Sequence, residues 1–128
     1  MEPLKILVVD DEPDVVMLIA RALNTEGFDV ISAYDGISAL DLAETETPDL
    51  ILLDIMMPMM NGYEVCQQLK GNPRTESIPV LCLSSAHSAN ARTLCRDAGA
   101  ATLILKPFTP AELVAQVRRH LPANRDAK

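Results

Sequence analysis

PDLILLD, residues 48–54, is a short apolar run that ends in an aspartate. Four consecutive aliphatic side chains at 50–53 are typical of a strand that is buried on both faces of a sheet. The same arrangement occurs near the N-terminus, where KILVVDD (residues 5–11) passes from apolar residues to two acids. The sequence therefore predicts buried strands whose carboxyl ends carry acidic side chains.

Strand and helix patterns alternate along the rest of the chain. We predict strands at residues 5–9, 28–33, 50–53, 79–83 and 101–105. Apolar residues at helical spacing predict helices within residues 15–23, 37–43, 63–69, 89–98 and 110–121. Gly27, Pro48 and Gly99 mark the ends of three helices, and Thr109 is the expected N-cap before Pro110.

Strict alternation of this kind predicts a single α/β domain with helices on both faces of a parallel sheet. Five units are too few for an eight-stranded barrel. We therefore predict a doubly wound five-stranded parallel sheet in the order 2-1-3-4-5, the flavodoxin-like (βα)5 fold. The domain is expected to cover residues 1–122, and residues 123–128 form a polar tail or the start of a linker.

Composition excludes several classes of function. The net charge of −7 argues against direct nucleic acid binding, since no basic surface is available for phosphates. The apolar runs are too short to span a membrane, and the N-terminus does not resemble a signal peptide. Three cysteines at wide spacings, Cys66, Cys82 and Cys95, do not suggest zinc and predict buried thiols in a reducing cytoplasm.

The carboxyl ends of the predicted strands gather chemically compatible side chains. Ligands bind such a sheet outside these ends, where the strand order reverses between the first and third strands. Asp10 and Asp11 follow the first strand and Asp54 the third, while Ser84 and Lys106 follow the fourth and fifth. Each residue alone has an ordinary structural explanation, such as a turn, a cap or a solvated charge. Together, three carboxylates, a hydroxyl and an ammonium group favour a functional site.

Three neighbouring carboxylates oppose one another's ionisation, and a hard divalent cation removes this conflict. Mg²⁺ prefers oxygen ligands and keeps positions open for a phosphate. A lysine would neutralise phosphate charge, and a serine hydroxyl would hydrogen-bond a phosphate oxygen. The arrangement therefore suits phosphoryl transfer to a carboxylate nucleophile.

Four motifs resemble the response-regulator receiver family of two-component signalling, the CheY-like receivers. They are ILVVDDE (6–12), PDLILLDIMMPMMNG (48–62), IPVLCLS (78–84) and LKPF (105–108). The similarity runs from residue 4 to about residue 121. It implies a phosphorylation-dependent switch, with a sensor histidine kinase or histidine phosphotransfer protein as donor and an unidentified downstream protein as partner.

The resemblance also implies roles for individual positions. Asp54 matches the phosphoacceptor. Asp11, Asp54 and the backbone carbonyl of Met56 would bind Mg²⁺ directly, and Asp10 would bind it through water. Two residues match the loop after the acceptor, Pro58 and Gly62.

On the other side of the site, Ser84 matches the switch hydroxyl and Lys106 the lysine that pairs with the phosphoryl group. The Lys106–Pro107 peptide bond is expected to be cis. Ser84 replaces the commoner threonine and keeps the hydroxyl. Leu103 occupies the position where the family often has a tyrosine or phenylalanine that swings inward with the hydroxyl. The usual readout through the fourth helix and fifth strand is therefore expected to be weakened.

Other functions remain open at this point. A Mg²⁺-dependent aspartyl phosphohydrolase of the haloacid dehalogenase type needs an acid two residues after its nucleophile, where this chain has Met56. A flavodoxin-like electron carrier would not place acids after the first strand. A receiver that docks partners without phosphorylation is a further alternative. We expect no enzyme activity beyond the domain's own phosphorylation and dephosphorylation.

Overall fold

The structure is a computed structural model that describes residues 3–57, 61–85 and 89–121. The strands are β1 (Lys5–Val9), β2 (Asp29–Ala33), β3 (Leu50–Asp54), β4 (Val80–Ser84) and β5 (Thr102–Leu105). The helices are α1 (Pro13–Thr25), α2 (Gly36–Glu46), α3 (Gly62–Lys70), α4 (Ala89–Asp97) and α5 (Pro110–His120). The predicted domain end at residue 122 and the tail at 123–128 lie outside the described residues.

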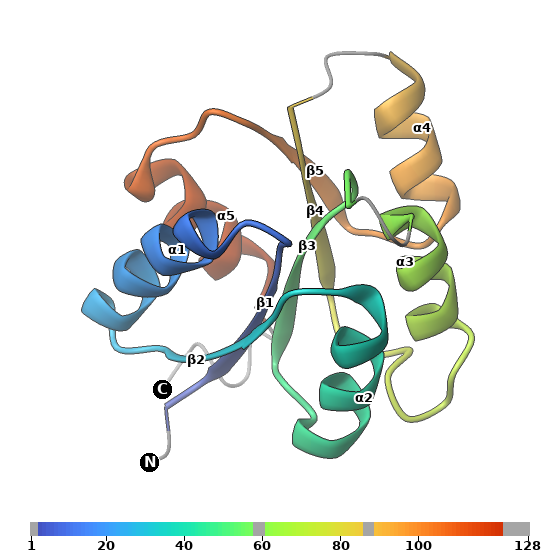
Figure 1. Ribbon diagram of the computed structural model, residues 1–128, viewed down its shortest axis with the longest axis horizontal. Helices are drawn as coiled ribbons and strands as arrows, with labels where there is room; N and C mark the ends of the chain where they lie inside the picture. The colour runs from blue at the N-terminus through green and yellow to red at the C-terminus, as the bar shows by residue number, and fades with distance from the viewer. Residues whose placement is uncertain (1–2, 58–60, 86–88, 122–128) are drawn as a thin grey trace.

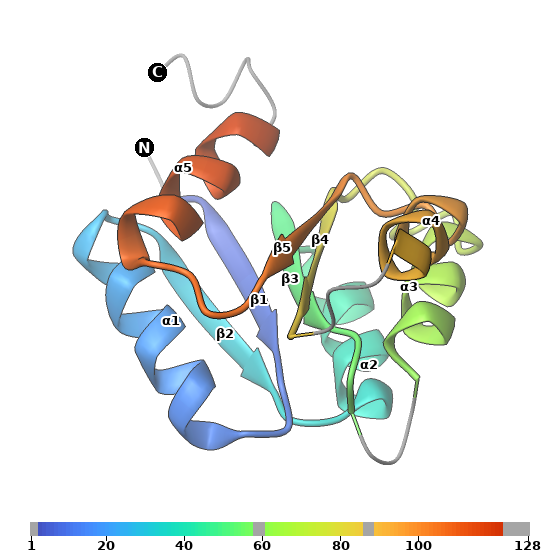
Figure 2. The ribbon, with the colours of Figure 1, turned by 90° about the horizontal axis from the view of Figure 1, so that it is seen from above.

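All strand pairs are parallel, and the order is β2-β1-β3-β4-β5. Helices α1 and α5 cover one face of the sheet, and α2, α3 and α4 cover the other (Figures 1 and 2). The prediction of a doubly wound (βα)5 sheet is therefore confirmed. In this topology β1 and β3 are neighbours at the point where the strand order reverses, so a crevice is expected beyond their carboxyl ends.

Alternation along the central strands divides the core between the two faces. Side chains on one face of the sheet pack with α1 and α5, among them Ile6, Val8, Leu50, Leu52, Leu81 and Leu83. Side chains on the other face pack toward α2 and α3, among them Leu7, Val9, Ile51, Leu53 and Val80. Both sets are completely buried, which explains why these strands are continuous apolar runs in the sequence.

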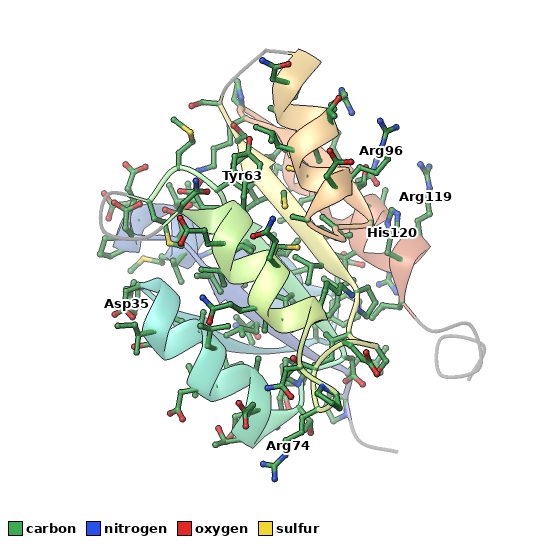
Figure 3. The ribbon with its side chains drawn as sticks, turned by 90° about the vertical axis from the view of Figure 1, so that its right-hand side faces the viewer. Asp35, Tyr63, Arg74, Arg96, Arg119 and His120 are labelled. Atoms are coloured by element: carbon green, nitrogen blue, oxygen red, sulfur yellow. The ribbon has the colours of Figure 1, made fainter. Side chains whose placement is uncertain are left out.

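Capping residues fix where the helices begin. Thr109 is the N-cap of α5, as predicted, and it forms a reciprocal capping box with Glu112. Asp35 caps α2 through the amide of Ser38, and Asn61 caps α3 through the amide of Tyr63. Figure 3 labels Asp35 and Tyr63 at the amino ends of α2 and α3.

Several boundaries differ from the prediction by one residue. Strand β2 begins at Asp29, because Phe28 belongs to the turn that closes α1 and its amide donates to the Leu23 carbonyl. The Phe28 ring packs in the core, with the Arg118 guanidinium 5.2 Å from its centre. Gly27 has φ +92°, a conformation that suits glycine at the end of a helix.

The predicted burial of the three cysteine side chains is confirmed. Cys66, Cys82 and Cys95 are free and buried, as expected for thiols that act as small apolar residues. Within the ranges that the structure describes, none of the helices has both the length and the apolar character required to cross a bilayer.

Candidate functional site

The register of the sheet brings four strand ends to one edge. In the ladders Val9 pairs with Leu53, Asp54 with Leu83, and Ser84 with Leu105. Asp10 follows the end of β1 and Lys106 follows the end of β5. The parallel pairing thus places Asp10, Asp54, Ser84 and Lys106 along the carboxyl edge, as the sequence predicted.

Asp54, the last residue of β3, is only 3% exposed. Its Oδ1 atom accepts a hydrogen bond of 3.0 Å from the backbone amide of Met56. Its Oδ2 atom lies 3.6 Å from the Nζ atom of Lys106. One carboxylate oxygen is therefore held by the loop that follows β3, while the other faces the cation.

Lys106 forms its shorter contact with Asp10. Its Nζ atom donates a hydrogen bond of 3.0 Å to Oδ2 of Asp10, which is completely buried. The other Asp10 oxygen accepts a hydrogen bond of 3.0 Å from the amide of Glu12. Burial lowers the pKa of Lys106, but the bond to Asp10 and the charge of Asp54 outweigh it and raise the pKa overall. Lys106 thus stays charged between two buried acids.

A third acidic side chain joins the pair that follows β1. Carboxylate oxygens of Asp10, Asp11 and Glu12 lie within 4.8 Å of one another. Their exposure increases along the chain, from buried Asp10 through half-buried Asp11 to exposed Glu12. The sequence prediction included Asp10 and Asp11 and left out Glu12, although a third consecutive acid in the same turn was a visible signal.

The surroundings of Asp54 disfavour its charge in the absence of a cation. Burial is the largest influence and raises the pKa of Asp54. The amide of Met56 lowers this pKa, the charge of Asp10 raises it, Lys106 lowers it, and Asp11 adds a further increase. The net effect is a raised pKa, so the folded structure holds a carboxylate that lacks sufficient positive charge nearby.

Ser84 and the turn after β5 complete the edge. Ser84 is completely buried at the end of β4, and its carbonyl accepts a hydrogen bond of 2.8 Å from the amide of Lys106. The Lys106–Pro107 peptide bond is cis in the structure, as the resemblance implies. The backbone therefore ties the residue predicted as the switch hydroxyl to the residue predicted as the phosphoryl-binding lysine.

Gly62 allows the start of α3 to approach the backbone of Asp54 and Ile55. A Cβ atom at this position would lie 2.3 Å from the Cα atom of Ile55 and 2.7 Å from the carbonyl oxygen of Asp54. Only glycine can approach the backbone this closely. Gly62 begins α3 rather than preceding it, and Pro58, the other predicted loop residue, lies outside the described residues.

Leu103 lies among apolar side chains rather than among the carboxylates. It is buried in a small apolar cluster beneath α4, formed by Ile55, Cys82, Ala91, Cys95 and Leu103. We call these residues the α4 cluster. A recess of about 190 Å³ between α4 and β5 adjoins it, with Leu103 and Cys95 in its lining and Arg92 and Arg96 beside them.

We call Asp10, Asp11, Asp54, Ser84 and Lys106 the pocket around Asp54. Its donor atoms suit a hard cation. Asp10, Asp11 and Asp54 supply carboxylate oxygens, the ligands that Mg²⁺ prefers. The raised pKa of Asp54 reflects a buried negative charge that a cation would stabilise. The residues therefore fit Mg²⁺ in chemical type. The role of the Met56 carbonyl stays a prediction.

Comparison with known proteins gives a consistent result. A family model described as the response regulator receiver domain matches residues 6–118. The alkaline phosphatase synthesis transcriptional regulatory protein PhoP of Bacillus subtilis is 45% identical over 114 residues, which cover 89% of this chain and 47% of that protein. The chain spans about half the length of the curated relatives it matches.

Solved structures resemble the whole domain. Vibrio cholerae chemotaxis protein CheY4 superposes with a TM-score of 0.89 at 29% identity, covering 93% of this chain and 99% of CheY4. The BeF3-activated N-terminal receiver domain of Klebsiella pneumoniae RstA gives a TM-score of 0.84 at 38% identity, covering 91% of this chain and 97% of the RstA chain.

Proposed function

The chain belongs to the response regulator receiver domain family of two-component signalling, and from this premise we propose that it is a switch phosphorylated on Asp54. The proposed donor is a phosphohistidine of a sensor histidine kinase or a histidine phosphotransfer protein. The observation that carries the proposal is the position of Asp54, which is buried at the carboxyl edge and shares the Lys106 ammonium group with buried Asp10.

The two oxygens of Asp54 have different surroundings, which favours one of them as the nucleophile. Oδ1 is engaged by the amide of Met56, so Oδ2, the oxygen near Lys106, is the proposed attacking atom. It forms a bond to phosphorus while the phosphorus–nitrogen bond to the donor histidine breaks. The imidazole leaves with that electron pair, and Asp54 becomes an acyl phosphate.

Lys106 is proposed to change its contact during this reaction. In the structure it bonds to Asp10 at 3.0 Å and lies 3.6 Å from Asp54. Phosphoryl oxygens on Asp54 would add negative charge on the side that Lys106 already faces. A shift of Nζ from Asp10 toward the phosphoryl group stabilises the product by charge pairing.

Asp10, Asp11 and Asp54, together with the carbonyl of Met56, are the groups that would hold Mg²⁺. The bound ion supplies charge neutralisation for the carboxylates and the phosphoryl oxygens. With the ion bound, the charge of Asp10 would be partly neutralised without Lys106. The proposed movement of Lys106 from Asp10 toward the phosphoryl group would then cost less free energy.

The proposed output is altered binding of a downstream protein, with Ser84 as the residue that responds to the phosphoryl group. Ser84 is buried at the edge and connected through its carbonyl to Lys106, so a movement of either residue affects the other. We propose a cytoplasmic location and no enzyme activity beyond the domain's own phosphorylation and dephosphorylation.

Mass spectrometry of the intact chain after incubation with acetyl phosphate tests the proposed acceptor. With Mg²⁺ we expect one added phosphoryl group, located on Asp54 by peptide mapping, and none in EDTA. Asp54→Asn should abolish the addition. Asp41→Asn, a change to an exposed acid on α2, is the matched control and should leave it intact.

Two results would contradict the proposal. Full labelling of Asp54→Asn would move the acceptor to another residue. Absence of labelling in the native chain by both acetyl phosphate and a phosphorylated histidine phosphotransfer protein would favour a receiver that docks partners without phosphorylation. The phosphohydrolase alternative has less support, because Met56, the residue two positions after Asp54, has no acidic group to protonate a leaving group.

A further inference from the structure

Exposed apolar side chains occur on α1, on the side of the sheet that this helix shares with α5 (Figures 1 and 2). Met17 is 61% exposed and Leu18 is 68% exposed. Single exposed apolar residues are ordinary, but two large adjacent ones bordering a recess suggest a surface that another molecule covers. Neither residue belongs to the pocket around Asp54.

The groove between α1 and α5 can accept such side chains. It is a recess of about 660 Å³, with a mainly apolar lining that includes Ala22, Ala111, Val114 and Ala115. Leu18 lines this recess and also borders two smaller ones, of about 260 and 180 Å³. Small alanines on neighbouring turns leave a hole of the kind into which a leucine side chain packs.

Two exposed charged residues flank the apolar pair on α1. Asp14, Met17, Leu18 and Arg21 line one continuous recess on the helix surface, and we call these four residues the α1 stripe. Neither Asp14 nor Arg21 forms an ion pair with another residue in the part of the chain that the structure describes. Arg118 and Glu26, in contrast, are paired with each other at 2.8 Å.

The spacing of the α1 stripe is symmetric about its centre. Asp14 and Arg21 are seven residues apart, which is about two turns or 10.5 Å along the helix and returns to nearly the same side. The midpoint between them falls between Met17 and Leu18. When two such helices cross antiparallel at this midpoint, Asp14 of each copy lies opposite Arg21 of the other.

We propose that the α1 stripe is the centre of a two-fold symmetric contact between two copies of this chain. In this contact Leu18 of each copy enters the groove between α1 and α5 of the other, and the two Asp14–Arg21 pairs flank the apolar centre. A two-fold interface must be complementary to itself, and the order acid, apolar, apolar, base meets that condition. The proposal does not rest on phosphorylation of Asp54, because no residue of the stripe contributes to the pocket.

Sedimentation of the full chain over a range of concentrations tests the apolar centre. We expect a reversible monomer–dimer equilibrium in which Leu18→Asp raises the dissociation constant about tenfold or more. Ile37→Asp is the matched control, since Ile37 is 76% exposed on α2 and should leave the constant unchanged. A chain that stays monomeric up to millimolar concentration overturns the proposal, and so does a dimer that tolerates Leu18→Asp.

A charge exchange tests the orientation. Asp14→Arg and Arg21→Asp each place like charges opposite one another and should weaken the dimer about fivefold. The double variant restores opposite charges across the axis and should return the dissociation constant to that of the native chain. Failure of this rescue overturns the antiparallel arrangement. A different result would be a native chain that is monomeric and a Leu18→Asp variant that no longer accepts a phosphoryl group from a histidine donor. This result would mean that the α1 stripe binds the donor protein, and it would also overturn the proposal. The Asp54 labelling experiment has a separate outcome, because it uses acetyl phosphate and needs no docking protein.

Discussion

The pocket around Asp54 and the α4 cluster lie on neighbouring strands and are stabilised in opposite ways. In the pocket, the buried carboxylates of Asp10 and Asp54 lie 3.0 and 3.6 Å from the Nζ atom of Lys106. In the α4 cluster, aliphatic and thiol side chains pack without formal charge. Ile55 links the two regions, since it follows Asp54 directly and packs in the cluster.

This difference teaches which region is prepared to respond to a ligand. A buried carboxylate is unfavourable until positive charge arrives, so the pocket gains free energy when a cation or phosphoryl group alters its charge balance. An apolar cluster already has its full burial energy and gains nothing from the same event. The structure thus combines a reactive edge with a stable interior where the family often has a mobile aromatic ring.

The largest expected effect on stability comes from Gly62, which contacts the backbone next to the pocket. Gly62→Ala should lower the free energy of unfolding by about 3 kcal/mol, because the new Cβ atom would overlap the backbone of Ile55 and Asp54. Gly71→Ala is the control, since its Cβ atom would lie 3.3 Å from the Gln67 carbonyl oxygen and requires only a small adjustment. Urea denaturation of both variants measures the difference, and equal stability would contradict the close approach of Gly62 to the backbone of Ile55 and Asp54.

Truncation in the α4 cluster is expected to have the next largest effect. Leu103→Ala should destabilise the fold by about 2 kcal/mol, at the low end for a buried leucine because the recess beside it allows water or side chains to move in. Acetyl phosphate labelling of Asp54 should continue at nearly the native rate. Loss of labelling in a folded Leu103→Ala variant would contradict the separation of pocket and cluster.

In the pocket, by contrast, a substitution at Asp54 should increase the free energy of unfolding. Asp54→Asn removes a buried charge and should raise the stability of the metal-free protein by about 1 kcal/mol at pH 7. The pKa of Asp54 is raised in the folded state, so the unfolded chain loses this proton first as the pH rises. Native stability therefore falls from about pH 4 up to the folded pKa, and the advantage of the variant grows over the same range.

Denaturation in EDTA from pH 3 to pH 8 checks this prediction, with exposed Asp41→Asn as the control. A variant no more stable than the native chain at pH 7 would mean that the carboxylates are not crowded as the structure shows.

A smaller effect is expected from Mg²⁺ itself. At a concentration equal to its dissociation constant, an ion that binds only the folded state adds about 0.4 kcal/mol. For a domain of this size the melting temperature would rise by roughly 2 °C. Thermal melts with Mg²⁺ and with EDTA measure this shift, which should be much reduced in Asp11→Asn. An equal shift in that variant would place the ion elsewhere.

The sequence predicted those features that follow from local pattern. Buried strands are continuous apolar runs, and acids directly after them mark the edge where parallel strands end together. The sequence pattern was therefore sufficient to place Asp10, Asp54 and Lys106 at this edge. The ends of helices and strands were less predictable. Phenylalanine is common in strands, so Phe28 was predicted to begin the second strand, but its position in the turn before β2 depends on packing against α5.

The sequence pattern did not predict which residues far apart in the chain are in contact. The shorter hydrogen bond of Lys106 is to Asp10, which lies 96 residues away in the sequence. Whether Lys106 lies nearer to Asp10 or to Asp54 depends on how β1, β3 and β5 are aligned at the edge of the sheet. The close approach of Gly62 to Ile55 and the packing of Leu103 against two cysteines likewise depend on the assembled core. Periodicity specifies which side chains face inward but not which of them meet.

Amide NMR spectra with EDTA and with Mg²⁺ plus beryllium fluoride test the central claim most directly. In the native chain we predict large shifts around Asp10, Asp54 and Lys106 and in the loops after β3 and β4, with small shifts at Leu103 and in residues 110–117. In Leu103→Tyr the ring can occupy the recess beside α4, and the shifts there should increase.

Absence of shifts around Asp54 would contradict the phosphoacceptor pocket. Shifts at Leu103 and residues 110–117 as large as those in the loops would contradict the claim that the pocket responds while the α4 cluster stays in place.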